Sequence, residues 1–98
     1  MDDPRLLARL QQGNRDEECR QEHLRVAAML RGAQREDVVR YAKSEVQRWR
    51  SQSLCSKDYV DSWEKLLDEP LRAASLLEEQ SPLARRLRQN TPFAAYLR

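Results

Sequence analysis

The chain has 98 residues, of which 40% are hydrophobic and 35% charged, and its formal net charge is +2. This length accommodates one domain with a single core, and the hydrophobic share excludes a largely disordered chain. No apolar run approaches the roughly 20 residues that span a bilayer, and the acidic start differs from a signal peptide. We therefore expect one cytoplasmic domain over residues 1–98, with no membrane partner.

The first predicted element covers residues 4–31, where apolar side chains recur three or four positions apart. The pattern lapses at Gly13-Asn14, which leaves open one long helix or two. We expect either a break there or an N-terminal arm of residues 1–14, flexible or separately packed, joined to a helix from about Arg15. Gly32 marks the end of this element, because glycine commonly follows the last helical residue.

Residues 36–50 form the clearest amphipathic helix of the chain. Its apolar stripe has spacings of three, four and three and consists of Val39, Ala42, Val46 and Trp49. The polar segment 51–56 interrupts this pattern, and Ser56 is placed to cap the next helix. That helix carries Trp63 on its apolar face and ends before Pro70.

Each proline directly follows a residue that can cap a helix. The four pairs are Asp3-Pro4, Glu69-Pro70, Ser81-Pro82 and Thr91-Pro92. Proline suits the first helical position, because its missing N–H would lack a partner there anyway. The pairs predict short helices from Pro70 and Pro82 and a final turn or short helix from Pro92. Helices this short are marginal alone in water, so we expect them to pack on the longer ones.

The sequence lacks strand-like alternation, hairpin dipeptides and internal repeats. The predicted fold class is therefore all-α, a compact bundle of four or five helices whose C-terminal members are short and started by proline. We expect the aromatic residues of the final segment, Phe93 and Tyr96, to pack in the core between Trp49 and Trp63.

Charged residues fall into blocks along the chain. Residues 38–57 are mainly basic, residues 58–80 mainly acidic, and residues 81–98 contain arginines but no acid. In one interpretation, the acidic helix packs beside its basic neighbours within the fold. In the other, basic side chains contact nucleic acid or an acidic protein. The candidates for nucleic-acid contact are Arg40, Lys43, Arg85, Arg86 and Arg88.

Few residues suit catalysis or metal binding. His23 is the sole histidine, and it shares a helix face with Cys19 four positions earlier. A structural zinc site takes four ligands, and Cys55 is the only other thiol, so we expect no metal. Two isolated glycines provide no phosphate-binding loop. We interpret Cys19 as a small core residue and His23 as partly exposed, and we expect no enzyme activity, catalytic residue or cofactor.

Two segments carry a resemblance to known proteins. They are LCSKDYVDSWEKLL, from Leu54 to Leu67, and LRQNTPF, from Leu87 to Phe93. Together they resemble short uncharacterised all-helical proteins of proteobacteria. The shared residues serve packing and capping, so the resemblance implies a helical fold and no particular activity. Fifteen arginines against three lysines also indicate a GC-rich bacterial genome.

The leading hypothesis is a small bacterial helical protein, an interaction or regulatory protein that acts without catalysis. It would bind another protein, or itself as a homodimer, through an apolar helical face. The candidates for this interface are Leu6, Leu7, Leu10, Phe93, Tyr96 and Leu97. The alternative is a nucleic-acid-binding module that uses the basic helices around residues 40–50 and 85–88.

Overall fold

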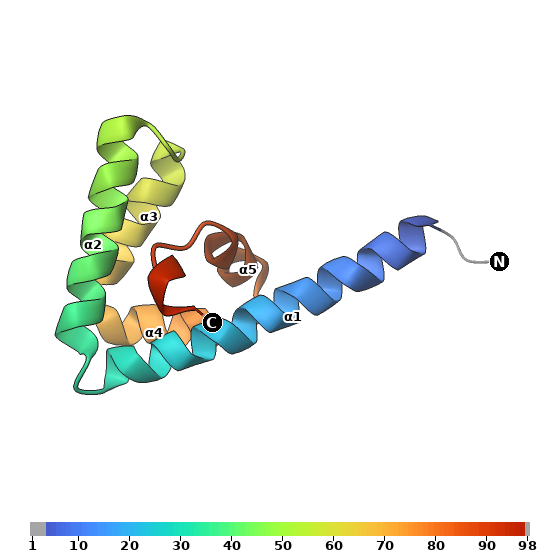
Figure 1. The fold of residues 1–98 in the computed structure, drawn as a ribbon, viewed down its shortest axis with the longest axis horizontal. Coiled ribbons are helices and arrows are strands. Elements are labelled where there is room, and N and C mark those ends of the chain that lie inside the picture. Colours follow the sequence, from blue (N-terminus) through green and yellow to red (C-terminus); the bar gives the residue numbers. More distant parts are fainter. Residues whose placement is uncertain (1–3, 98) are drawn as a thin grey trace.

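The computed structural model describes the backbone of residues 4–97 and the side chains of residues 15–97. This part of the chain forms five α-helices and one short 3-10 helix, and it contains no strand. In chain order they are α1 Pro4–Arg31, α2 Arg35–Gln52, α3 Lys57–Leu67, α4 Pro70–Glu78, α5 Pro82–Gln89 and η1 Ala94–Tyr96. The prediction of an all-α fold with short C-terminal helices is confirmed (Figure 1). None of the described helices is long and apolar enough to cross a membrane.

α1 is one uninterrupted helix, so the break considered at Gly13-Asn14 does not occur. A glycine inside a helix costs about 1 kcal/mol relative to alanine. The 28 residues of α1 tolerate this cost, because much of the helix is stabilised by packing. α1 ends at Arg31, directly before Gly32 as predicted, and the Gly32 amide donates to the Met29 carbonyl oxygen at 3.1 Å.

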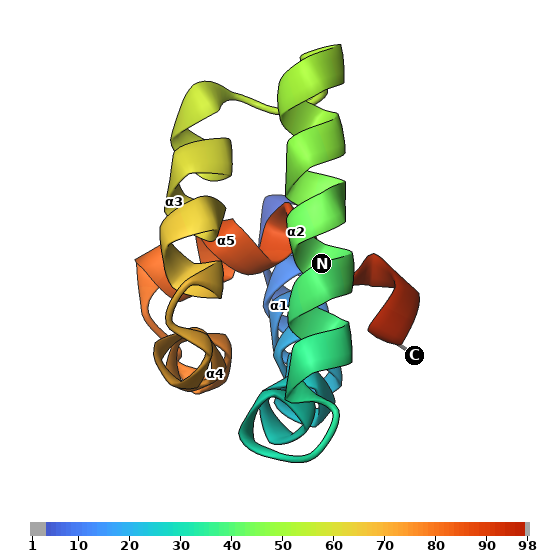
Figure 2. The ribbon, with the colours of Figure 1, turned by 90° about the vertical axis from the view of Figure 1, so that its left-hand side faces the viewer.

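α2 and α3 lie side by side and run in opposite directions (Figures 1 and 2). α2 ends at Gln52, and the next residue, Ser53, adopts the left-handed conformation with a φ of 53°. The amide of Leu54 then donates to the Trp49 carbonyl oxygen at 2.9 Å, which closes the helix end. Ser56 precedes α3 as predicted, although its side chain makes no capping hydrogen bond.

Ion pairs join the basic α2 to the acidic α3 and the residue that follows it. Arg50 contacts Asp61 at 2.8 Å and Glu64 at 3.0 Å. Lys43 contacts Asp68 at 3.1 Å. The interpretation that the acidic helix packs beside a basic neighbour is therefore confirmed for this pair of helices. Such exposed pairs add little to the stability of the fold, but the carboxylate in each pair partly neutralises the charge of its cation.

Two of the C-terminal prolines begin helices as predicted, at the first residues of α4 and α5. Ser81 caps α5, because its hydroxyl oxygen accepts from the Ala84 amide at 3.2 Å. The prediction of a final turn or short helix from Pro92 is confirmed, since Pro92 and Phe93 form a turn and η1 follows from Ala94. The hydroxyl of Thr91 accepts from the Phe93 amide and also bonds with a side chain of α1.

The core draws buried hydrophobic residues from all five α-helices and from the C-terminal segment. They are Val26, Ala27, Leu30, Val38, Ala42, Val46, Val60, Trp63, Leu67, Ala73, Ala74, Leu77, Leu87 and Phe93. Phe93 meets Trp63 edge to face, with ring centroids 5.5 Å apart at 86°. Trp49 is only partly buried against this cluster. Phe93 therefore completes the core as predicted, whereas Tyr96 is only partly buried against it.

Candidate functional site

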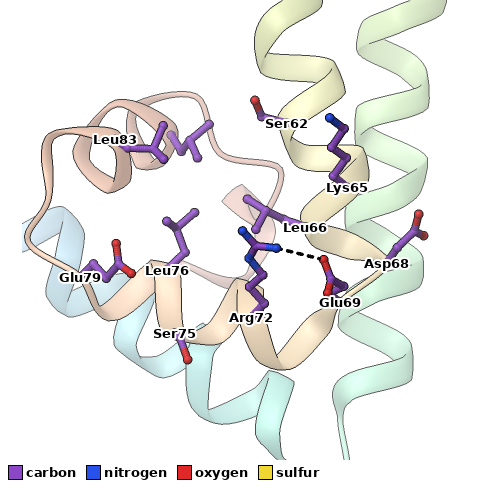
Figure 3. Close-up of a pocket in the computed structure, with 11 residues that line it drawn as sticks. Ser62, Lys65, Leu66, Asp68, Glu69, Arg72, Ser75, Leu76, Glu79 and Leu83 are labelled. Atoms are coloured by element: carbon purple, nitrogen blue, oxygen red, sulfur yellow. Dashed lines mark hydrogen bonds and ion pairs between the residues drawn. The ribbon is translucent and has the colours of Figure 1, made fainter.

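A groove of about 680 Å³ lies between α3, α4 and α5 (Figure 3). Its apolar lining consists of Leu66, Leu76, Leu83 and Leu87. Its polar lining consists of Ser62, Lys65, Asp68, Glu69, Arg72, Ser75 and Glu79. An apolar floor bordered by charged side chains is typical of surfaces that bind apolar side chains of a partner.

The local sequence places the three walls of the groove. The α3–α4 link ends at Pro70, which starts α4 in a new direction, and Pro82 does the same for α5. Figure 3 shows Leu66, Leu76 and Leu83 directed into the same hollow, one from each helix. Because α5 does not cover α3 and α4 completely, these leucines form a depression instead of a closed core.

Leu83 is the exposed apolar residue of this groove. Three large hydrophobic side chains of the described chain are strongly exposed: Leu54 at 54%, Leu71 at 55% and Leu83 at 55%. Leu54 lies in the α2–α3 loop, and Leu71 lines a smaller hollow at the start of α4. Leu83 alone of the three lines the groove. The groove therefore contains apolar surface that folding leaves in contact with water.

Carboxylates outnumber cations in the groove by three to two. Glu69 pairs with Arg72 at 3.4 Å, and Asp68 pairs with a lysine of α2 at 3.1 Å. The carboxylate of Glu79 accepts from a serine hydroxyl at 3.0 Å, and Lys65 has no ion pair among the described residues. No three His, Cys, Asp or Glu of the described chain form a group that could hold a metal ion.

The candidate interface residues at the C-terminus pack within the chain. Phe93 is 0% exposed and offers no surface to a partner. The Tyr96 ring meets Tyr41 edge to face at 5.3 Å, and Leu97 is partly buried against the core. The candidates at the other end lie in α1, but their side chains fall outside the described residues: Leu6, Leu7 and Leu10.

The basic candidates on α2 are paired with acids. Arg40 contacts Asp37 at 3.4 Å, and both side chains are about three-quarters exposed. Lys43 contacts Asp68 across to the end of α3. Nearby carboxylates weaken the attraction of these cations for a phosphate backbone.

The basic candidates on α5 have three different surroundings. Arg85 is exposed. Arg86 lies over the Tyr59 ring, 5.1 Å from its centroid, and donates from Nε to the Tyr59 hydroxyl at 3.3 Å. Arg88 is buried. The structure therefore does not bring the three arginines together as one exposed patch.

Arg88 is 3% exposed and closes the end of α4. Its Nη1 donates to the carbonyl oxygens of Leu77 at 3.1 Å and Glu79 at 2.8 Å. Carbonyls at a helix C-terminus lack partners within the helix, so this contact satisfies two of them. Burial lowers the pKa of the Arg88 guanidinium. One sequence signal could have shown this role, since Arg88 shares the helix face of Ala84 and Leu87.

The prediction that His23 is partly exposed is wrong, because the residue is 0% exposed. Its Nδ1 lies 2.7 Å from the Cys19 carbonyl oxygen, which can only accept, so Nδ1 carries the proton. Burial lowers the pKa of His23 and favours the neutral ring, in which Nε2 accepts from the Thr91 hydroxyl at 2.9 Å. The same hydroxyl oxygen accepts from the Phe93 amide at 3.1 Å. His23 thus connects α1 to the segment that inserts Phe93 into the core.

The charge states of His23 and Cys19 follow from their burial. Burial lowers the pKa of His23, and the nearby Arg88 lowers it further, while the bond to the Cys19 carbonyl opposes both. Burial also raises the pKa of the Cys19 thiol. Both conditions favour neutral side chains. A neutral thiol is a poor nucleophile, so this pair has the properties of packing residues.

Comparisons with protein-family models, with curated proteins and with solved structures found no match for this chain. The resemblance to proteobacterial helical proteins stays a prediction, and the functional argument depends on the groove itself.

Proposed function

We propose that this protein is a non-catalytic interaction module that binds an amphipathic helix of a protein partner in the groove between α3, α4 and α5. The observation that carries the proposal is Leu83, more than half exposed beside three other leucines in a hollow of about 680 Å³. Burying apolar surface is worth about 25 cal/mol per Å², so a partner that covers this lining gains affinity. Helix-in-groove recognition uses apolar side chains three or four residues apart on one helix face.

Peptide selection tests this proposal directly. A random peptide library is displayed and selected on the immobilised full chain. We expect the enriched peptides to carry large apolar residues at spacings of three and four, which form one helix face. Leu83→Glu is expected to weaken these peptides about tenfold or more, because the partner would have to desolvate a carboxylate in an apolar contact.

Leu54→Glu is the matched control. Leu54 and Leu83 have nearly equal exposure, 54% and 55%, but Leu54 lies outside the groove. The two substitutions therefore add the same charge at equally exposed sites, and we expect the Leu54 variant to bind the peptides like the unaltered chain. Failure to enrich any helix-patterned peptide, or equal binding by both variants, would contradict the proposal.

The nucleic-acid alternative has less support. Arg40 and Lys43 have carboxylate partners, and Arg88 is buried behind backbone carbonyls. Arg85 and Arg86 remain, and two cations supply few of the phosphate contacts on which such binding depends. We therefore propose the groove, and not the basic residues, as the binding site.

A further inference from the structure

The N-terminal part of α1 has the sequence of a short amphipathic helix. α1 begins at Pro4. Three leucines follow at positions i, i+1 and i+4, a spacing that puts them on one side of a helix: Leu6, Leu7 and Leu10. Arg5 and Arg9 lie four residues apart, on a second row beside these leucines. Residues 4–12 thus combine an apolar stripe with two positive charges and no acid.

The C-terminal part of α1 is fixed on α4. Arg20 donates from Nε to the Glu78 carbonyl oxygen at 2.9 Å, and Arg31 forms an ion pair with the Glu78 carboxylate. A helix of 28 residues is roughly 42 Å long at 1.5 Å per residue. The N-terminal part of α1 consequently extends past the other helices, as Figure 1 shows.

The groove complements residues 4–12 in polarity and in charge. Its leucine lining matches an apolar helix face, and Glu79, the groove carboxylate without an ion pair among the described residues, is available to an arginine of this segment. We infer that the groove binds residues 4–12 of a second copy of this chain. This inference rests on the proposed function and names the partner of that same groove.

A second copy fits better than the chain's own N-terminus. α1 continues without a break from Pro4 and leads away from α3, so its first residues reach their own groove only if the helix breaks. A second molecule has no such constraint. When each copy inserts its N-terminal helix into the other, the two contacts are equivalent and the assembly closes as a two-fold dimer.

Sedimentation velocity of the full chain and its variants tests the inference. At about 100 µM, well above a micromolar Kd, we expect a mass near twice 11.6 kDa. The double variant Leu6→Glu/Leu10→Glu and the groove variant Leu83→Glu should each sediment as monomers. Leu54→Glu, the exposure-matched control, should remain dimeric. Circular dichroism on each variant confirms that its helices are retained.

Mixing the two monomeric variants gives the sharpest result. The N-terminal variant keeps an intact groove, and the Leu83 variant keeps an intact N-terminal helix. We expect their equimolar mixture to form a heterodimer through one remaining contact, weaker than the unaltered dimer with two contacts.

Three outcomes would overturn the inference: a monomeric unaltered chain at this concentration, a dimeric N-terminal variant, or a dimeric Leu83→Glu variant. If the N-terminal variant still dimerises but Leu83→Glu does not, the groove binds a segment other than residues 4–12, and the proposed function is retained. If the unaltered chain is monomeric but still selects helical peptides, the inference fails and the proposed function is again retained.

Discussion

Phe93→Ala is expected to lower the free energy of unfolding by about 3–5 kcal/mol, the range for removing a buried phenylalanine. Phe93 is fully buried and meets Trp63 edge to face, so its removal leaves a cavity and deletes an aromatic contact. The consequence extends along the tail, because Tyr96 and Leu97 depend on the same segment for their place against the core. The substitution therefore tests whether the C-terminus belongs to the core.

Thermal and urea unfolding followed by circular dichroism measure this effect. A loss of that size lowers the melting temperature of a domain of this length by about 12 °C or more. The difference should not depend on protein concentration, because Phe93 packs within its own chain. Leu54→Ala changes an exposed leucine and should stay within about 0.5 kcal/mol. An unchanged melting temperature with lost self-association would instead place Phe93 at an interface between chains.

The free energy of unfolding is expected to fall as the pH decreases below 6.5, because of the protonation of His23 in the unfolded chain. Burial and Arg88 on α5 lower the pKa of His23 from its usual 6.5, while Glu22 on α1 opposes them. Above pH 6.5 the histidine is neutral in both the folded and the unfolded chain, so it adds no pH dependence. Below 6.5 the unfolded chain binds a proton that the folded chain does not, and the free energy of unfolding decreases.

Urea unfolding at intervals between pH 7 and pH 5 measures this dependence. One proton changes stability by at most about 1.4 kcal/mol per pH unit. The carboxylates with lowered pKa values, Glu17, Glu45, Asp61 and Glu78, lose their contribution only at lower pH. His23 is the sole histidine, so it dominates this window.

His23→Gln is the matched variant for the pH experiment. Glutamine retains a donor and an acceptor but does not titrate, so its stability should stay nearly constant between pH 7 and pH 5. The same slope in both proteins, or no slope in the unaltered chain, would contradict a neutral buried His23. Thr91→Val offers a second check, since it leaves His23 Nε2 and the Phe93 amide without partners, at about 1–3 kcal/mol for each buried group.

Local signals were enough to predict most of the fold. Periodic apolar residues and the prolines at the starts of α4 and α5 place four helices, because these features act within a few residues of each other. Local signals did not predict the bond between the Thr91 hydroxyl and His23, a residue 68 positions away. Sequence spacing does not show a contact of that range.

The candidate site was harder to predict for the same reason. Leu83 and Leu87 lie four residues apart on α5 and look alike in the sequence, yet Leu87 is 4% exposed and Leu83 is 55% exposed. Arg88 likewise has the same residue type as Arg85 and Arg86, but it alone is turned toward the carbonyls that end α4. In each case the angle at which α5 packs decides which side chain is buried.

The measurement that tests the central claim most directly is an NMR titration. The ¹⁵N-labelled Leu6→Glu/Leu10→Glu variant is titrated with an unlabelled peptide of residues 1–14, to about 1 mM to cover weak binding. We predict amide shift changes that cluster around the groove, on α3, α4 and α5, with Leu83 among the most affected. Changes confined to α2 or to the tail, or none at all, would contradict the assignment of the groove as the docking surface for this helix.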